Sequence, residues 1–376
     1  MPVISSTQSS SIHSSLFATG PIRLSFILVT FSLFAFTRAE HTQAHADQPP
    51  NTANPAVVET YKLEDLGELS PISQDVTVSL NQDGTVAYWT RTNGSVYAML
   101  WRSGKATRVE QMPGYPNMIP HAINRQGDIA GWMNTSGNLV DSLSTTRGFV
   151  RHRKRIRIVT GLGGRDSRIF GLNDKGSAVG AATLADGTRH AFVISGSKIA
   201  DLGTLPFGKS STAYAINNSG LIAGSSDVDA KANHAVSWSN LKIVDLGTLP
   251  KGIVSSARSV NDRGQIVGFS DTPDGVHAFL YSDGVMQDLG TLGSDPSEAS
   301  GINNHSEVVG ASNITGTRRH AFLWRDGQIK DLNVFLPGGS SWILLDAFSI
   351  NDRGQIACSA RRKGEPSHLL LLTPQH

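Results

Sequence analysis

A repeat that runs through most of the chain constrains its fold more than any other feature. The clearest copy, residues 259–293, holds three signatures in fixed order. The first signature is an apolar residue followed by Asn-x-x-Gly and then by an apolar pair and Gly. The second is His-Ala-Phe, and the third is Asp-Leu-Gly-Thr-Leu. The Asn of the first signature recurs seven times, at Asn81, Asn124, Asn173, Asn217, Asn261, Asn303 and Asn351. Its spacings of 42 to 49 residues indicate an array of similar structural units.

The other two signatures follow the same count. His-Ala-Phe copies begin at His190, His234, His277 and His320, with a weaker copy at His368. Tyr97 and Arg147 fill the His position in the first two repeats. The Asp of the third signature is clear at Asp65, Asp201, Asp245 and Asp288, altered at Asp331, and expected in faded form near Glu110 and Thr160. Three independent signatures therefore predict seven units.

Each unit has the pattern of four short antiparallel strands. In the clearest copy we expect strands over 257–261, 265–269, 277–281 and 285–289, with tight turns after the first and third and a loop of about six residues after the second. Small sheets stacked around an axis form a β-propeller, whose repeat length fits this one. The prediction is an all-β, seven-bladed β-propeller of four-stranded antiparallel blades. A β-solenoid is the alternative, although its coils are usually shorter and lack hairpin turns.

The phase of the repeats predicts how the ring closes. The first ordered segment, Tyr61 to Leu66, is a copy of a fourth strand, and the last, His368 to Leu372, is a copy of a third strand with nothing after it. We therefore expect residues 61–66 to complete the blade formed by the carboxyl-terminal strands.

The amino terminus has the pattern of a secretory signal peptide. An apolar run from Leu24 to Phe36 is too short to span a bilayer, and Ala44-His45-Ala46 provides a small-x-small cleavage signal. We expect a signal peptide at 1–46 cleaved after Ala46, a disordered tether at 47–57 and the propeller at 58–376. An uncleaved anchor is the alternative. The predicted location is secreted or periplasmic, without stable membrane insertion.

The signatures as they stand, HAF, DLGTL and INxxGxxxG, resemble the probable extracellular repeat of the HAF family. The resemblance covers residues 61–372 and is most specific over 186–335. It implies an exported, propeller-like bacterial protein and implies no activity. The substitutions Tyr97 and Arg147 argue against a function that needs seven identical positions.

No catalytic, cofactor-binding or metal-binding residues are predicted. The repeated His and Asp are interpreted as partners in hydrogen bonds within blades, rather than as metal ligands. The basic run from Arg151 to Arg155 could bind an acidic partner, but a solvated outer edge is the preferred interpretation. Asp227 and Asp229 are expected in a polar loop, and Cys358 as a packed small residue. Trp342 could stack on a sugar, but packing beneath its own loop is favoured.

The near balance of 33 basic and 31 acidic residues gives no argument for nucleic acid as a partner. The absence of the usual hydrolase and phosphate-binding motifs favours a non-catalytic binding or interaction module, acting through propeller loops or the channel mouth. The expected ligand is an unknown protein or glycan, and the expected state is a monomer. The alternative is a propeller-fold hydrolase or lyase acting on carbohydrates or lactones, which would need carboxylates or metal ligands converging on the axis.

Overall fold

The computed structural model describes residues 59–69, 77–136 and 145–375. The chain divides into two units, 1–56 and 57–376, and all described residues belong to the second. The predicted signal peptide (1–46) and nearly all of the tether (47–57) fall in the first, and both lie outside the described residues. Within the described part of the chain, no helix is long and apolar enough to cross a bilayer.

The described residues form seven blades of four antiparallel strands, called blades 1 to 7 here; five are separate sheets, and blades 1 and 2 share one eight-stranded sheet. Blade 1 contains β2(Ser79–Leu80), β3(Val86–Thr92), β4(Ser95–Arg102) and β5(Lys105–Arg108). Blade 2 contains β6(Asn117–Ile123), β7(Ile129–Asn134), β8(Thr146–His152) and β9(Arg155–Val159). Blade 3 contains β10(Ser167–Leu172), β11(Ala178–Thr183), β12(Arg189–Ser195) and β13(Lys198–Gly203). One parallel pairing, Val96 with Asn117, connects blades 1 and 2.

The remaining blades follow the same order. Blade 4 contains β14(Ser211–Ile216), β15(Ile222–Asp227), β16(Asn233–Ser239) and β17(Lys242–Gly247). Blade 5 contains β18(Ser255–Val260), β19(Ile266–Thr272), β20(Gly275–Ser282) and β21(Val285–Asp288). Blade 6 contains β22(Ser294–Ile302), β23(Val308–Thr315), β24(Arg318–Arg325) and β25(Gln328–Asp331), followed by the 3₁₀ helix η1(Leu332–Phe335). Blade 7 contains β26(Ile343–Ile350), β27(Ile356–Arg361), β28(Ser367–Gln375) and β1(Thr60–Glu68).

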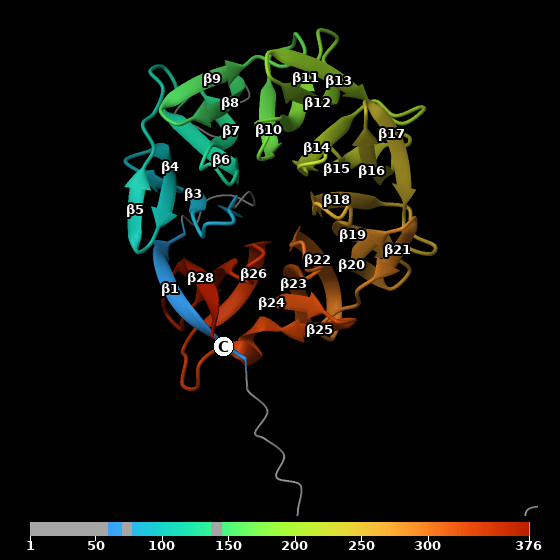
Figure 1. Cartoon of the computed structure of the whole chain (residues 1–376). Coiled ribbons are helices and arrows are strands. Elements are labelled where there is room, and N and C mark those ends of the chain that lie inside the picture. The colour runs from blue at the N-terminus through green and yellow to red at the C-terminus, as the bar shows by residue number, and fades with distance from the viewer. Residues whose placement is uncertain (1–58, 70–76, 137–144, 376) are drawn as a thin grey trace, which may run out of the picture. The chain divides into compact units, whose positions relative to one another are not determined.

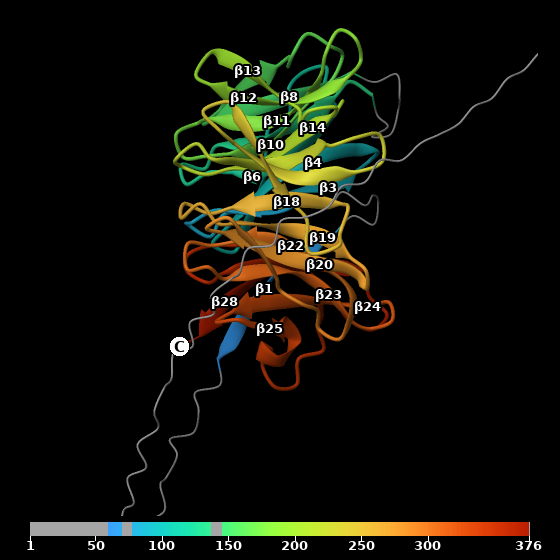
Figure 2. The ribbon, with the colours of Figure 1, turned by 90° about the vertical axis from the view of Figure 1, so that its right-hand side faces the viewer.

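The blades are arranged around a central axis, with the first strand of each blade innermost (Figure 1). Figure 2 shows the same ring from the side. The predicted seven-bladed propeller is confirmed, and the four strands expected in blade 5 correspond to β18 to β21. The loop expected between the second and third of them was too long, because β19 and β20 extend to within two residues of each other.

The predicted ring closure is also confirmed. β1 pairs antiparallel with β28, with Leu63 opposite Leu372 and Tyr61 opposite Pro374. Tyr61 is 2% exposed and packs edge-on against Phe335. The amino-terminal strand is thus the outer strand of the carboxyl-terminal blade, and in Figure 1 blue β1 lies beside red β28.

The hydrophobic core lies between neighbouring blades. Val179 and Ala191 of blade 3, for example, share a buried cluster with Val236 and Trp238 of blade 4. Each sheet is therefore covered on both faces, which explains why the central strands are apolar without alternation.

A β-bulge interrupts the innermost strand of six blades. In blade 5, Ala257 pairs with Gly268 and Ser259 pairs with Val267, so Arg258 is the extra residue. The bulge brings the carbonyl oxygen of Ser256 so close to Gly268 that a Cβ there would overlap it. The repeated glycine seven residues after the Asn therefore accommodates the bulge. The same overlap would occur in four other blades, at Gly131, Gly180, Gly224 and Gly310.

Candidate functional site

The seven repeated asparagines form a closed ring of hydrogen bonds about the axis. Each Nδ2 donates to the backbone carbonyl of the next blade's Asn, at 2.9 to 3.3 Å, and Asn351 closes the cycle on Asn81 at 3.0 Å. The side-chain oxygen of Asn261 accepts from the amides of Arg263 and Gln265 and so folds its own turn. All seven are buried. This signature residue therefore builds both the turn and the contact between blades.

The residues that follow these asparagines form a second, more exposed ring. Asp174 accepts from Asn218, which also donates to Asp262, and Asn304 donates to Asp352. The rings surround a narrow opening of about 160 Å³. The carboxylates are satisfied by neighbouring amides. Among the described residues, no group of three or more His, Cys, Asp or Glu side chains could hold a metal ion.

A much larger cavity, of about 910 Å³, lies at the other end of the inner strands. Its volume is typical of small-molecule sites. The six bulge residues, each three positions before a repeated Asn, all line it: His121, Phe170, Tyr214, Arg258, Ser300 and Phe348. The bulges therefore direct one side chain per blade into the cavity. The scaffold positions repeat, whereas these six positions carry five different residue types.

Aromatic and cationic side chains line one side of this cavity. The His121 and Phe170 rings lie 5.0 Å apart, and Phe170 and Tyr214 5.6 Å apart. The guanidinium of Arg168 lies 4.6 Å from the ring centre of Trp132, and that of Arg258 lies 4.5 Å from Tyr214. Blades 2 to 5 therefore present a continuous arc of rings flanked by two arginines.

His121 remains neutral within this arc. Its Nε2 accepts a hydrogen bond from Trp132 Nε1 at 3.0 Å. Burial, reinforced by the positive charge of Arg168, lowers the pKa of His121 to about 3. The ring is therefore uncharged near neutral pH, with its proton on Nδ1.

The opposite side of the cavity holds two carboxylates that converge on one arginine. Arg319 Nε lies 2.5 Å from Asp346 Oδ1, and its Nη2 lies 3.9 Å from Glu298 Oε2. Ser359 also donates to Asp346 at 3.2 Å. Arg319 therefore balances the acidic charge of blades 6 and 7 locally.

The repeated His and Asp pair within blades, as expected. His190, His234, His277, His320 and His368 contact Asp201, Asp245, Asp288, Asp331 and Asp65 at 2.6 to 3.0 Å. These Asp side chains also accept from turn amides, such as that of Gly290 at 2.7 Å. The pairs therefore join the third and fourth strands of blades 3 to 7.

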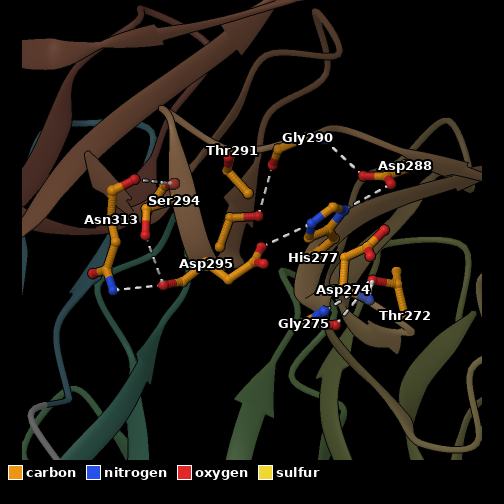
Figure 3. Close-up of polar contacts among 12 residues, drawn as sticks. Thr272, Asp274, Gly275, His277, Asp288, Gly290, Thr291, Ser294, Asp295 and Asn313 are labelled. Atoms are coloured by element: carbon orange, nitrogen blue, oxygen red, sulfur yellow. Dashed lines mark hydrogen bonds and ion pairs between the residues drawn. The ribbon is translucent and has the colours of Figure 1, made fainter. Parts of the chain in front are cut away.

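One pair has an additional partner in the next blade. His277 Nδ1 lies 2.8 Å from Asp288, and its Nε2 lies 2.8 Å from Asp295, which begins blade 6 (Figure 3). Burial disfavours the charged ring, but the hydrogen bonds and charges of the two carboxylates outweigh burial and raise the pKa of His277. An imidazolium here can donate to both carboxylates.

The first two blades replace this pair differently. In blade 1 the guanidinium of Arg108 stacks 3.1 Å from the ring centre of Tyr97. The strand register places Arg108 and Ile158 in the Asp position, so the expected positions near Glu110 and Thr160 were wrong by two residues. Arg147 of blade 2 donates instead to the backbone carbonyl of Arg165. Too few residues of the signature remain in these blades to fix its register from the sequence.

The other candidates lie on hairpins and loops or in the core. The Arg151–Arg155 run lies on the outer β8–β9 hairpin, where His152 contacts Asp128 at 2.8 Å. Cys358 is fully buried, and burial raises its pKa. Trp342 is 9% exposed, beneath the guanidinium of Arg362. Asp229 accepts from two amides of its own loop.

Sequence reasoning missed the cavity-lining residues. The available signal was variation between repeats, since the third residue before each Asn changes while its neighbours stay apolar or small. The usual alternation of side chains along a strand assumes that there is no bulge, so it does not predict that this residue points into the cavity.

Comparisons with known proteins support the fold alone. No family model matches the chain, and no curated protein matches it. A puromycin-hydrolyzing peptidase of Mycobacterium tuberculosis has a TM-score of 0.51 at 11% identity, covering 82% of this chain and 54% of that one. A streptogramin B lyase has a TM-score of 0.48 at 14% identity, covering 84% and 98%. The β-propeller domain of the trilobed protease from Pyrococcus furiosus has a TM-score of 0.46 at 9% identity, covering 68% and 80%.

Proposed function

We propose that the propeller is a non-catalytic binding module and that its ligand enters the 910 Å³ cavity. The observation that carries this proposal is the set of six bulge residues, which the scaffold directs into one cavity. Positions that build the fold repeat from blade to blade, whereas His121, Phe170, Tyr214 and Arg258 differ. Stability alone gives no reason for this division.

The biological setting is proposed from the sequence. The signatures support a protein of the HAF-repeat type, and the amino-terminal pattern supports export to the periplasm or the exterior. A glycan or protein ligand is consistent with aromatic rings at a channel mouth.

A blocking substitution tests the proposal. Ser300 is an exposed bulge residue on the cavity wall, so Ser300→Trp should fill space without disturbing the core. The matched control is Ser195→Trp, at an exposed hairpin outside the cavity. We expect a glycan or metabolite array to yield ligands that bind the native chain and the control but not Ser300→Trp. Ligands that bind all three proteins equally would contradict the proposal.

A second candidate function rests on the convergence of Glu298 and Asp346 on Arg319. Paired carboxylates in a cavity are the machinery of glycoside hydrolysis, so a hydrolase or lyase is the alternative. Turnover of a carbohydrate or lactone that is lost in both Glu298→Gln and Asp346→Asn would favour the enzyme.

A further inference from the structure

Charge in the cavity is distributed unevenly. On the side of blades 6 and 7, Arg319 is paired with Asp346 and faces Glu298. On the opposite side, Arg168 and Arg258 form no ion pair with any carboxylate of the described residues. Positive charge is therefore uncompensated on the aromatic side alone.

These two arginines lie over aromatic rings, and their N–H groups donate no hydrogen bond to another described residue. Arg168 lies over Trp132, and Arg258 over Tyr214 and, at 5.2 Å, over Phe269. A guanidinium stacked on a ring uses its flat face, while its N–H groups point outward in the plane. That edge matches the two oxygens of a carboxylate.

Neighbouring groups strengthen the preference for an anion. His121 is neutral and contributes no competing positive or negative charge. Burial and the nearby Arg168 lower the pKa of Arg189 and outweigh Asp166, which acts in the opposite direction, so positive charge prevails on this side. Between the arginines, Phe170 offers an aromatic surface next to His121 and Tyr214.

Building on the proposed binding function, we propose that the cavity binds a ring that carries a carboxylate. Arg168 and Arg258, at the two ends of the arc, attract the carboxylate, and the rings of His121, Phe170 and Tyr214 pack against the ligand's ring. An acidic sugar and an aromatic acid share this chemistry.

Calorimetric titration of the full chain with two matched pairs of probes tests the inference. Trigalacturonate is compared with the neutral galactose trisaccharide, and 4-hydroxybenzoate with 4-hydroxybenzamide. We expect at least one acid to bind about tenfold or more tightly than its neutral partner, as for hydrogen bonds to a charged group. The pair that shows this difference distinguishes a sugar from an aromatic ligand.

Three arginine variants test which side chains attract the carboxylate. Arg258→Gln and Arg168→Gln should each weaken binding of the preferred acid about tenfold or more. Arg155→Gln, in the exposed basic run outside the cavity, is the control for nonspecific attraction and should leave binding unchanged. Circular dichroism checks that all three variants are folded.

The outcomes separate this inference from the proposed function. Equal affinity for acids and neutral partners, or equal weakening by Arg155→Gln and Arg258→Gln, overturns the inference. If none of the four probes binds, the inference is also overturned. The proposed function is judged separately, by ligands sensitive to Ser300→Trp.

Discussion

At the scale of single residues, the His–Asp pairs connect strands within a blade, and among the described residues only the His277 pair also contacts the next blade. Its two ring nitrogens lie 2.8 Å from carboxylates of blade 5 and blade 6. Asn313 holds Asp295 in place by donating to its backbone carbonyl at 2.8 Å. Protonation of one imidazole therefore strengthens a contact between blades.

This arrangement predicts a pH dependence of stability. Because the pKa of His277 is raised in the folded state, its contribution is fully present below the unfolded pKa of about 6.5 and is lost as pH rises through the folded value. We expect the urea midpoint of the native protein to fall more steeply from about pH 6 to pH 9 than that of His277→Gln. The control is His234→Gln, whose ring contacts the single carboxylate of Asp245. Equal slopes in the native protein and His277→Gln would contradict the prediction.

A second residue-scale prediction concerns the glycine beneath each bulge. Gly268→Ala should lower the free energy of unfolding by about 2–4 kcal/mol, because its Cβ would overlap the carbonyl oxygen of Ser256. Gly338→Ala is the control, since a Cβ there meets nothing within 4 Å. Urea denaturation measures both. A stable Gly268→Ala protein would mean that the bulge is not needed.

At the scale of secondary-structure elements, β1 closes the ring. It covers the edge of β28, which would otherwise expose a row of unpaired backbone groups. Tyr61 and Leu66 add buried apolar area, and Glu59 pairs with Arg325 of blade 6. The first described segment therefore joins the last two blades.

Deleting residues 58–67 from the full chain should lower the thermal midpoint by about 10 °C or more, given the burial of two large side chains and the loss of a whole strand. Tyr61→Ala should lower it by a smaller amount. Lys62→Ala, an exposed position of the same strand, should leave it unchanged. Differential scanning calorimetry measures the thermal midpoint of each protein. An unchanged midpoint in the deletion variant would show that β1 is dispensable.

The strands, their order and the closing strand were predictable from the sequence because each depends on local signals repeated many times. The Asn turn, the His–Asp pairs and the phase of the repeats are of this kind. The cavity was not predictable, because a bulge at Arg258 or Phe170 reverses the direction that alternation assigns to a side chain. Faded signatures also misplaced the Asp positions of blades 1 and 2.

At the scale of the whole molecule, the asparagine ring links every blade to the next and returns to its start. Asn217→Asp removes one link, because a carboxylate cannot donate to the carbonyl of Asn261 and would be buried beside it. We expect a loss of about 3 kcal/mol or more in the free energy of unfolding. Asn240→Asp, at an exposed hairpin of the same blade, is the control. Equal stability of the two variants would argue against the ring.

The bulges separate the residues that line the cavity from those that build the scaffold. A substitution at the exposed Ser300 changes the wall of the cavity, yet leaves the asparagine cycle and the buried clusters between blades untouched. The proposed binding selectivity can thus be altered by exchanging a few amino acids, one in each of several blades. Substituting the cavity-lining bulge residues while keeping the scaffold residues is therefore a way to engineer receptors.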